Sequence, residues 1–592
     1  MRSLLHLLPY LSRYRLPFWL GNGGLVLARL FEALIPLLLK RGIDSVAAGH
    51  AALLGPVLGI VACVLARFAA IVSSRRVIRR IGMAVAYDLR RRVYTHLQHQ
   101  GPGFFARHPT GDLMARAIND IALVRQLVGQ GTRTILVLLF SAAVGFLFMF
   151  VQSPSLTLLL LPPLPVVTIA AYLLARRVYH DSTALQAGFS TLSDRVQENM
   201  NGIRTIQALG QEDGETRRFG AVNDEYADRY YTLMRTNSII ASLMPLLGAA
   251  CTLVILGVGG RQVLSGAISI GTFTSFFWYV GMVLWPVREA GNMVNLVQRG
   301  AAATTRLFEI LDHEPEIADR PAPDAPDRLR GAVSLRGVSY THEGSREPAV
   351  RDVDLEIAAG ETVALVGRIG SGKSTLLRLL VRVLDPPPGS VLLDGWDVRE
   401  LPLALVRRDV AMVPQEAFLF ALSLRENVAY DDPERRDDEV WSATEAADLR
   451  TTAEGFPEQL ATLVGERGVT LSGGQKQRTT LARGLIRSAP VLLLDDCFSS
   501  VDTETEERIL RRLRRLRKGL TTVLVSHRVS TARRADRIAV LEKGRIVELG
   551  SHRELIARGG LYAALERAQQ RREHLLEELD ASDVAPRTAE PA

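Results

Sequence analysis

Residues Glu361–Val383 read ETVALVGRIGSGKSTLLRLLVRV, and this stretch decides the fold of the second half of the chain. A short β-like run, Glu361–Val366, is followed at once by the loop Gly367–Thr375 and then by a helical run, Leu376–Val383. This is the phosphate-binding pattern GxxxxGK[ST] in the strand–loop–helix setting that it requires. Backbone N–H groups of such a loop surround phosphates, and the following helix adds its positive end. The stretch therefore predicts an α/β P-loop cassette that binds ATP.

The loop also supplies two side chains with defined chemistry. We expect Lys373 to neutralise β- and γ-phosphate oxygens and Ser374 to offer its hydroxyl to Mg²⁺. Two more apolar strands follow, Val491–Leu494 and Thr521–Val525. The first is followed directly by Asp495. A carboxylate at the end of a strand beside the P-loop can hold the metal through water, so we expect Asp495 to have this role. The second ends at Ser526-His527, where the histidine could reach the γ-phosphate.

Another glycine pair lies between the loop and these strands. Leu471–Arg478 reads LSGGQKQR and opens a predicted helix, Gln477–Ile486. Glycines at a helix start make a second anion-binding end. Because one ATP cannot easily use this end and the P-loop of the same chain, we expect a second cassette that faces the first head to tail.

The first half of the chain has a different character. At 592 residues the chain is too long for one core, so at least two domains are expected. Six apolar segments have roughly the 20 residues that a helix needs to cross a bilayer. They are Pro17–Leu39, Leu53–Val72, Gly131–Val151, Leu156–Leu174, Ile239–Leu264 and Thr272–Leu296. The bilayer is therefore a predicted partner of this half.

The positive charge is concentrated between these segments. Residues 73–130 hold ten arginines against three aspartates, nearly the whole net charge of +8. A basic loop between membrane spans is typical of the cytoplasmic side, so we expect no nucleic acid as a partner. An even number of spans then places the N-terminus, the cassette and the C-terminus in the cytoplasm. The three cysteines, Cys63, Cys251 and Cys497, lack the spacing of a metal site or a disulfide framework.

About sixty residues separate spans 2 and 3, and again spans 4 and 5. These connections predict two helical hairpins that extend from the membrane, the first with turns at Gly101–Gly103 and His108–Gly111. Arg29 and Glu32 lie three apart on one helical face of span 1, so we expect them to pair. Arg67 in span 2, and Arg288 and Glu289 in span 6, could line a cavity or form structural ion pairs.

We predict four parts of the chain. They are a membrane domain of six helices with long cytoplasmic extensions (1–311), a linker (312–330), the cassette (331–570) and a flexible charged tail (571–592). The Pro- and Asp-rich linker is expected to act only as a tether.

The combination of motifs resembles a known family. LSGGQ at Leu471–Gln475, with the P-loop upstream and VLLLDD downstream, is similar to the signature of ATP-binding cassette (ABC) proteins. The six-span domain fused ahead of the cassette resembles the ABC exporter half-transporters, and within them the multidrug-resistance-like MdlA-type subunits of heterodimeric exporters. Phe104–Asp120 and Val196–Gln211 match family patterns in the two hairpins.

The resemblance implies roles for individual residues. Tyr340 would stack on adenine, Gln415 would touch Mg²⁺ and the attacking water, and His527 would be the switch histidine. Asp502 would link two nucleotide sites, and Thr462–Gly468 would sit against the cytoplasmic turns. The phosphates would be cradled by Gly367, Arg368, Gly370, Ser371, Gly372, Lys373, Ser374 and Thr375. The opposite subunit's ATP would be met by the signature residues Ser472, Gly473, Gly474 and Gln475, with Ser472 and Gly474 on its γ-phosphate.

One position departs from the family pattern. Members competent in hydrolysis usually carry glutamate after the metal-binding aspartate, and this chain has Asp496. A carboxylate one methylene shorter falls roughly 1 Å short of the attacking water, a displacement that can cost about a hundredfold in rate.

These features favour one function and leave others open. We expect an ATP-hydrolysing exporter subunit in a bacterial-type inner membrane, with a slow ATP site and a second half-transporter as heterodimer partner. Its cargo would be amphipathic small molecules or lipids. A homodimer whose Asp496 works adequately, a lipid flippase or peptide exporter, and an ATP-binding regulatory subunit are the alternatives.

Overall fold

The structure is a computed structural model that describes residues 2–49, 53–319, 322–465 and 468–571. The chain forms two compact units. The first comprises Met1–Gln98 and Thr110–Glu314, and the second comprises His99–Pro109 and Pro315–Ala592. Within the helices, the side chains of 163–168, 171–172, 175, 244, 247 and 286–292 lie outside the description. Arg288, Glu289 and the predicted tail from residue 572 therefore stay predictions.

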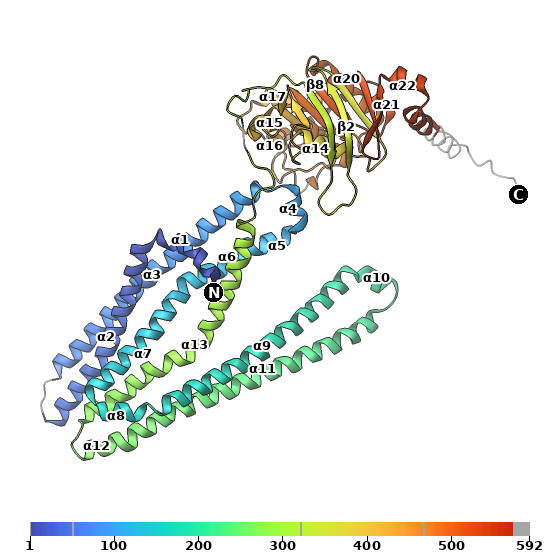
Figure 1. The fold of residues 1–592 in the computed structure, drawn as a ribbon. Helices are drawn as coiled ribbons and strands as arrows, with labels where there is room; N and C mark the ends of the chain where they lie inside the picture. The colour runs from blue at the N-terminus through green and yellow to red at the C-terminus, as the bar shows by residue number, and fades with distance from the viewer. Residues whose placement is uncertain (1, 50–52, 320–321, 466–467, 572–592) are drawn as a thin grey trace. The chain divides into compact units, whose positions relative to one another are not determined.

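The first unit is all helical. Its long helices are α2 (Arg15–Ala47), α3 (Leu54–Gln98), α7 (Thr132–Gln152), α9 (Pro163–Asn201), α11 (Glu212–Val254) and α13 (Ile270–Leu311). Short helices connect them: η1 (Arg2–Leu7), α1 (Leu8–Ser12), α5 (Thr110–Ala115), α6 (Ile121–Gln126), α8 (Pro154–Leu160), α10 (Ile203–Ala208) and α12 (Gly260–Leu264). The π-helical turns η2 (Arg116–Asp120), η3 (Leu127–Gly131) and η4 (Ile255–Gly259) complete the unit. Figure 1 shows α9 and α11 running side by side to α10, as the second predicted hairpin requires.

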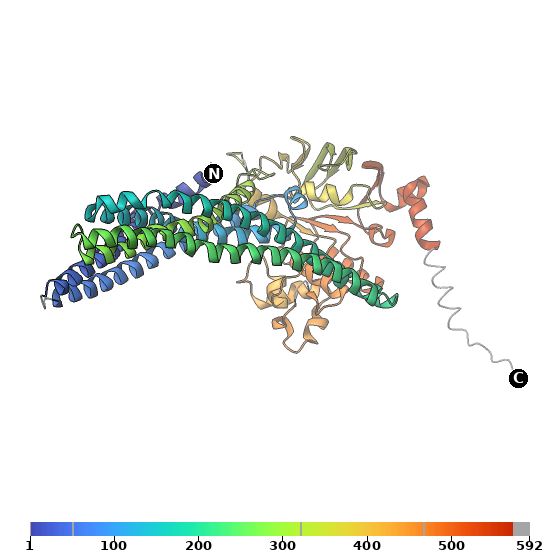
Figure 2. The ribbon, with the colours of Figure 1, turned by 90° about the horizontal axis from the view of Figure 1, so that it is seen from below.

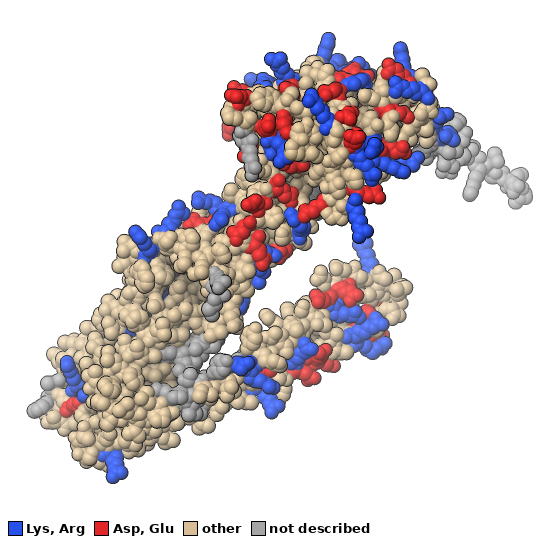
Figure 3. All heavy atoms as spheres, viewed as in Figure 1, with Lys and Arg blue, Asp and Glu red and all other residues tan. Residues whose placement is uncertain are grey.

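Four helical stretches of the described part are long and apolar enough to cross a membrane. They are Arg15–Ala47, Leu54–Gln98, Thr110–Gln152 and Glu212–Leu264, which contain predicted spans 1, 3 and 5 and all but the first residue of span 2. Span 4 falls in α8 and α9, and span 6 in α13, whose part Ile270–Trp285 is a shorter apolar helix. Figure 3 shows a wide band of this unit with few charged side chains, while charged groups gather towards the α10 tip and the ends of the other long helices.

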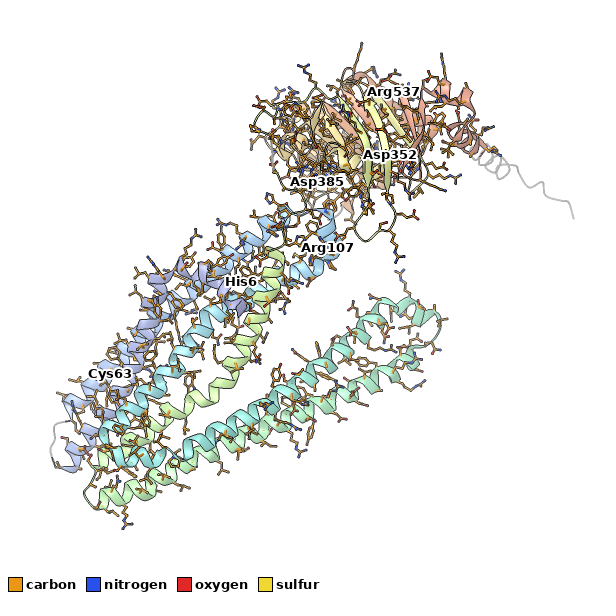
Figure 4. All side chains as sticks on the ribbon, viewed as in Figure 1. His6, Cys63, Arg107, Asp352, Asp385 and Arg537 are labelled. Carbon is orange, nitrogen blue, oxygen red and sulfur yellow. The ribbon has the colours of Figure 1, made fainter. Side chains whose placement is uncertain are left out.

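Charges inside the helical unit are partly compensated. Arg29 donates to Glu32, which confirms the predicted pair, and Arg67 Nη2 donates to the same carboxylate at 3.1 Å. Figure 4 labels Cys63 on α3, one helical turn before Arg67. Nearer the loops, Arg306 Nε donates to Asp120 Oδ2 at 2.9 Å.

The second unit holds two sheets. A four-stranded antiparallel sheet has the order β2 (Val350–Ile357), β1 (Val333–Tyr340), β4 (Val391–Leu393), β5 (Trp396–Asp397). A six-stranded sheet has the order β10 (Arg545–Gly550), β9 (Arg537–Glu542), β3 (Thr362–Gly367), β8 (Thr521–Val525), β7 (Val491–Asp495), β6 (Val410–Val413). Its helices are α14 (Lys373–Leu380), α15 (Leu403–Asp409), α16 (Leu424–Val428), α17 (Asp437–Ala446), α18 (Arg450–Glu454), α19 (Gly473–Leu485), α20 (Thr503–Leu516), α21 (Val529–Ala532) and α22 (His552–Arg558), with the short turn η5 (Gln459–Ala461). Figure 2 gives a second view of these elements.

The parallel strands explain where the predicted site residues meet. Strands β3, β7 and β8 are apolar on both faces and almost fully buried, as the central strands of a parallel sheet must be. They pair in parallel, β3 with β8 and β8 with β7. Their carboxyl ends therefore share one edge of the sheet, where Gly367, Asp495 and Ser526 lie.

The turn of the first predicted hairpin belongs to the second unit. It forms α4 (Pro102–Arg107), which carries the Arg107 labelled in Figure 4. Arg107 Nη2 donates to Glu316 Oε1 at 3.2 Å and its Nη1 donates to Glu343 Oε1 at 3.0 Å. Gly103 N also donates to Glu316 Oε2, at 3.2 Å. The turn is thus hydrogen bonded to two residues of the second unit, one before and one after β1 in the sequence.

The segment predicted to be only a tether is packed instead. Its Ile317 and Leu329 are buried. The buried guanidinium of Arg382 donates through Nη2 to Ala318 O at 2.8 Å and through Nε to Asp385 Oδ1 at 2.8 Å. Composition missed this because the partners of the segment lie about sixty residues further along the chain.

We expect Arg382 to fix this segment on the cassette. Replacing Arg382 by Met removes its donors from Ala318 O and from the buried carbonyls of Val398 and Leu401, a loss of about 3 kcal/mol. Since 1.4 kcal/mol is tenfold, amides of residues 316–319 should exchange hydrogen roughly a hundredfold faster, as measured by mass spectrometry on the full chain. Arg378→Met, at an exposed position of α14, is the control. Equal exchange in both variants would contradict the assignment.

Candidate nucleotide site

The P-loop joins the buried strand β3 to helix α14. Gly370 and Gly372 have φ values of +80° and +98°, a region that side chains with a Cβ rarely adopt. A Cβ on Gly372 would also lie 2.4 Å from Ala349 O. Glycine is therefore required at position 372 both by the backbone conformation and by the close approach of Ala349, the residue directly before β2.

Lys373 is buried inside this loop. Its Nζ donates to Gly367 O at 2.9 Å, to Arg368 O at 2.8 Å and to Ser371 Oγ at 3.2 Å. Burial lowers the pKa of Lys373, while the nearby carboxylates of Asp496 and Asp495 oppose that shift. The ammonium is thus placed by the loop at the edge of the sheet where anionic groups gather.

Ser374 and Asp495 form the candidate metal site. Ser374 Oγ donates to Asp495 Oδ1 at 2.7 Å, so a residue of α14 and the last residue of β7 are in direct contact. The hydroxyl and carboxylate oxygens are hard donors of the kind that Mg²⁺ prefers. Gln415, which follows β6 and contacts the neighbouring Asp496, carries an amide oxygen of the same kind, so the donor types of the three residues predicted to hold Mg²⁺ fit that ion.

The residue after Asp495 sits at the centre of a polar cluster. Gln415 Nε2 donates to Asp496 Oδ2 at 3.4 Å, and His527 Nε2 lies 3.9 Å from the same oxygen. Asp496 has φ of +44°, and aspartate is among the residues that tolerate this region best. Burial raises the pKa of Asp496, and the charge of Asp495 adds to the effect, while His527 and Lys373 oppose it. The structure brings Gln415, Asp496 and His527 together, as their proposed common role requires.

The start of α19 is built by a capping box. Ser472 Oγ accepts from Gln475 N at 3.3 Å, and Gln475 Oε1 accepts from Ser472 N at 2.9 Å. The helix begins at Gly473, four residues before the predicted start, because this box satisfies its first turn. The amide groups that the glycines leave uncovered are the basis of the predicted anion-binding end.

The same helix positions the segment that follows Asp496. Gln477 Nε2 donates to Ser499 Oγ at 2.7 Å, and its Oε1 accepts from Ser500 N at 2.8 Å. Asp502 ends this segment as the N-cap of α20, where it accepts from Thr505 N at 2.9 Å. The hydrogen bonds from Thr505 lower the pKa of Asp502. Among the described residues, no hydrogen bond joins Ser472–Gln475 to the P-loop.

The region predicted to contact adenine contains a residue that the sequence reasoning missed. Tyr340 ends β1 and packs partly buried against the apolar cluster of the smaller sheet. His342, two residues on, contacts the P-loop directly, with Nε2 at 3.2 Å from Thr375 Oγ1. The rings of Tyr340 and His342 meet edge to face at 5.2 Å. The sequence did offer a signal for this residue, namely a histidine two positions after the tyrosine that was expected to stack on adenine.

The segment predicted to meet the cytoplasmic turns is only partly described. Thr462 O accepts from Leu424 N at 2.9 Å, and Leu463 forms an isolated bridge with Ser423. Residues 466 and 467 lie outside the described part of the chain.

Two family models match the chain. The model described as ABC transporter transmembrane region matches residues 19–287, and the model described as ABC transporter matches residues 350–499.

Similar proteins match across both regions. The uncharacterized ABC transporter ATP-binding protein YknV of Bacillus subtilis (strain 168) is 34% identical over 85% of this chain and 83% of its own length. An ATP-dependent lipid A-core flippase of Syntrophus aciditrophicus (strain SB) is 35% identical over 85% and 83%. The probable multidrug resistance ABC transporter ATP-binding/permease protein YheI of B. subtilis is 36% identical over 81% and 82%. A solved bacterial Atm1-family ABC exporter with ATP bound superposes with a TM-score of 0.74 at 27% identity, over 95% of this chain and 99% of that one.

The two signature glycines should respond differently to an added methyl group. A Cβ on Gly474 would lie 2.9 Å from the backbone oxygen of Ser500, whereas one on Gly473 meets Ser500 Cβ at 3.6 Å. We expect Gly474→Ala to cost about 1–3 kcal/mol in the free energy of unfolding of the cassette, and Gly473→Ala to change it by under about 0.5 kcal/mol. Denaturant unfolding of the purified chain measures both. Equal stability of the two variants would show that the Ser499–Asp502 segment moves freely away from α19.

Proposed function

The chain belongs to the ABC transporter family, as an exporter-type membrane domain fused to an ATP-binding cassette, and we propose that it is the slow-site subunit of a heterodimeric exporter. Proteins of this family hydrolyse ATP and bind it in the cassette, and ABC exporters act as dimers on lipid or drug substrates. The helical unit makes this chain a multi-pass membrane protein. The proposed part concerns the partner, the rate of its own site and the cargo.

The observation that carries the proposal is the geometry at Asp496. Its carboxylate lies with Gln415 and His527 at the edge of the sheet, directly after the Asp495 that contacts Ser374. A general base must come within hydrogen-bond reach of the water it activates. The aspartate side chain is one methylene shorter than the glutamate usual in the family, so its carboxylate stops roughly 1 Å short.

The remaining residues have complementary roles in this proposal. Lys373 neutralises phosphate oxygens, and His527 donates to the γ-phosphate. Ser374, Asp495 and Gln415 hold Mg²⁺, which when bound offsets charge on the β- and γ-oxygens. Tyr340 stacks on the adenine of ATP with His342 beside it, and Gly367–Thr375 binds the phosphates. Ser472–Gln475 and Asp502 complete the partner's site, and the partner's cassette does the same here.

The arginine-rich segment supports the proposed orientation in the membrane, and the names of similar proteins support the proposed class of cargo. The arginine-rich segment 73–130 supports an inner cell membrane location with the N-terminus, cassette and C-terminus in the cytoplasm. We retain 1–311, 312–330, 331–570 and 571–592 as the division into membrane domain, linker, cassette and tail. Relatives named as lipid A-core flippases and a multidrug transporter favour an amphipathic cargo. A homodimer, or a regulatory subunit that does not hydrolyse ATP, remains the alternative to be tested.

Lengthening the side chain at position 496 should restore the rate. We expect Asp496→Glu to raise kcat for ATP hydrolysis of the purified chain by on the order of a hundredfold, because the carboxylate then reaches the water. Asp496→Asn, which keeps the length and removes the base, should lower the residual rate further. Assays of the chain alone and with its partner complete the test. Full activity of the unaltered homodimer would overturn the slow-site proposal.

The residual rate should also carry the signature of Asp496 in its pH dependence. The carboxylate acts as a base only when ionised, and burial raises its pKa above the usual 3.8. The rate should therefore rise with pH through a limb that lies above the range of an exposed aspartate. This limb should vanish in Asp496→Asn. A limb that persists in this variant would assign the titration to another group.

A further inference from the structure

The helical unit contains a large cavity whose charged lining residues are all positive. Its volume is about 980 Å³, and its walls come from α3, from the segment η2 to α7 and from α13. Five arginines line it, Arg75, Arg79, Arg125, Arg133 and Arg299. No aspartate or glutamate is among its lining residues in the described part of the chain.

The position of these arginines along the chain gives the depth of the cavity. Arg75 and Arg79 follow the apolar segment that ends at Val72, and Arg299 follows the one that ends at Leu296. Arg125 and Arg133 flank Gly131, where the third segment begins. All five therefore lie at or just beyond the ends of the apolar segments, where the headgroups of a bilayer that covers these segments are expected. Basic pockets between membrane helices at this depth bind anionic headgroups.

Other arginines of the same helical unit form ion pairs with acidic residues. Arg116 Nε donates to Asp112 Oδ2 at 2.9 Å, and Arg306 Nε donates to Asp120 Oδ2 at 2.9 Å. None of the five cavity arginines forms an ion pair with a described acidic residue. Arg79 Nε reaches only Arg75 O at 3.3 Å, and Arg125 Nη1 only Met83 Sδ at 3.4 Å. Clustered like charges raise the energy of the fold unless an anion compensates them.

The part of the wall that carries Arg125 and Arg133 is not a regular α-helix. The π-helical turns η2 and η3 lie on either side of α6, and Asn119, Gly129 and Gln130 from these turns line the cavity. Such turns are frequent at functional sites. A Cβ on Gly82 of α3 would be 3.2 Å from Arg125 O, so α3 and α6 approach closely and fix Arg125. Apolar Ile78, Met83 and Leu123 also line the cavity.

We propose that this cavity binds the anionic, phosphate-bearing head of an amphipathic molecule, and that such molecules are the cargo class of the transporter. The arginine forks pair with phosphate oxygens, and the apolar lining receives the part of the molecule next to the head. The cargo assignment rests on the proposed exporter function. The binding site itself does not.

Binding is tested on the purified full-length chain in neutral detergent without ATP, using a fluorescent-tailed phosphatidic acid as the probe. Fluorescence anisotropy should give saturable binding that unlabelled phosphatidic acid displaces. Phosphatidylcholine with the same acyl chains, and inorganic phosphate, should displace it at least tenfold less well. Equal displacement by phosphatidylcholine would show that the tails alone bind, and equal displacement by phosphate would show a site for a soluble anion. Either result overturns the proposal.

Matched variants separate the cavity from general surface charge. Arg75→Gln with Arg79→Gln should weaken binding tenfold or more, whereas Arg76→Gln with Arg80→Gln, exposed neighbours on α3 that do not line the cavity, should change it less than twofold. The charge-preserving pair Arg75→Lys with Arg79→Lys should restore most of the affinity and shows that the fold tolerates the change. Equal loss in both glutamine pairs would overturn the proposal. Basal ATP hydrolysis on the same samples tests the exporter function separately.

Discussion

The cassette depends on how one buried cation is compensated. The Lys373 ammonium is enclosed by carbonyl oxygens of its own loop, and burial works against its charge. Asp495 and Asp496 oppose that penalty from the end of β7. This arrangement exists only because β3, β8 and β7 run parallel and end at one edge of the sheet. Burial at the same edge, together with the charge of Asp495, also disfavours the ionised form of Asp496, so the arrangement that holds Lys373 also raises the pKa of the carboxyl beside it.

Much of the cassette follows from the sequence because its signals are local. The apolar runs before Gly367 and Asp495, and the run before Ser526, predicted three strands to within one residue at each end. The strand–loop–helix around Lys373 needs no distant contact to be recognised. The helix at Gly473 begins earlier than predicted because a capping box, rather than an apolar period, decides its start.

Features that depend on distant partners could not be predicted in the same way. The segment before the cassette looks like a tether by composition, yet Arg382 binds it from beyond the P-loop helix. His342 is one exposed-looking residue in a loop, and its contact with Thr375 appears only when the two sheets pack. The cavity gathers arginines from α3, α6, α7 and α13, and the sequence shows only three of the five as part of its basic segment.

The charges of the helical unit follow two different rules. Arg29 and Arg67, which lie deep within apolar segments, share one acid, because Glu32 accepts from both. At the loop-bearing ends, arginines such as Arg116 and Arg306 also have acids within reach. The cavity arginines lie on the same helical unit as these acids. None of the acidic residues in the described part of the chain lines the cavity. A helix bundle needs no such uncompensated group for packing, since neutral side chains would fill the same volume at lower electrostatic energy. The most direct physical reason for the cluster is that the compensating negative charge arrives with the molecule that the cavity binds.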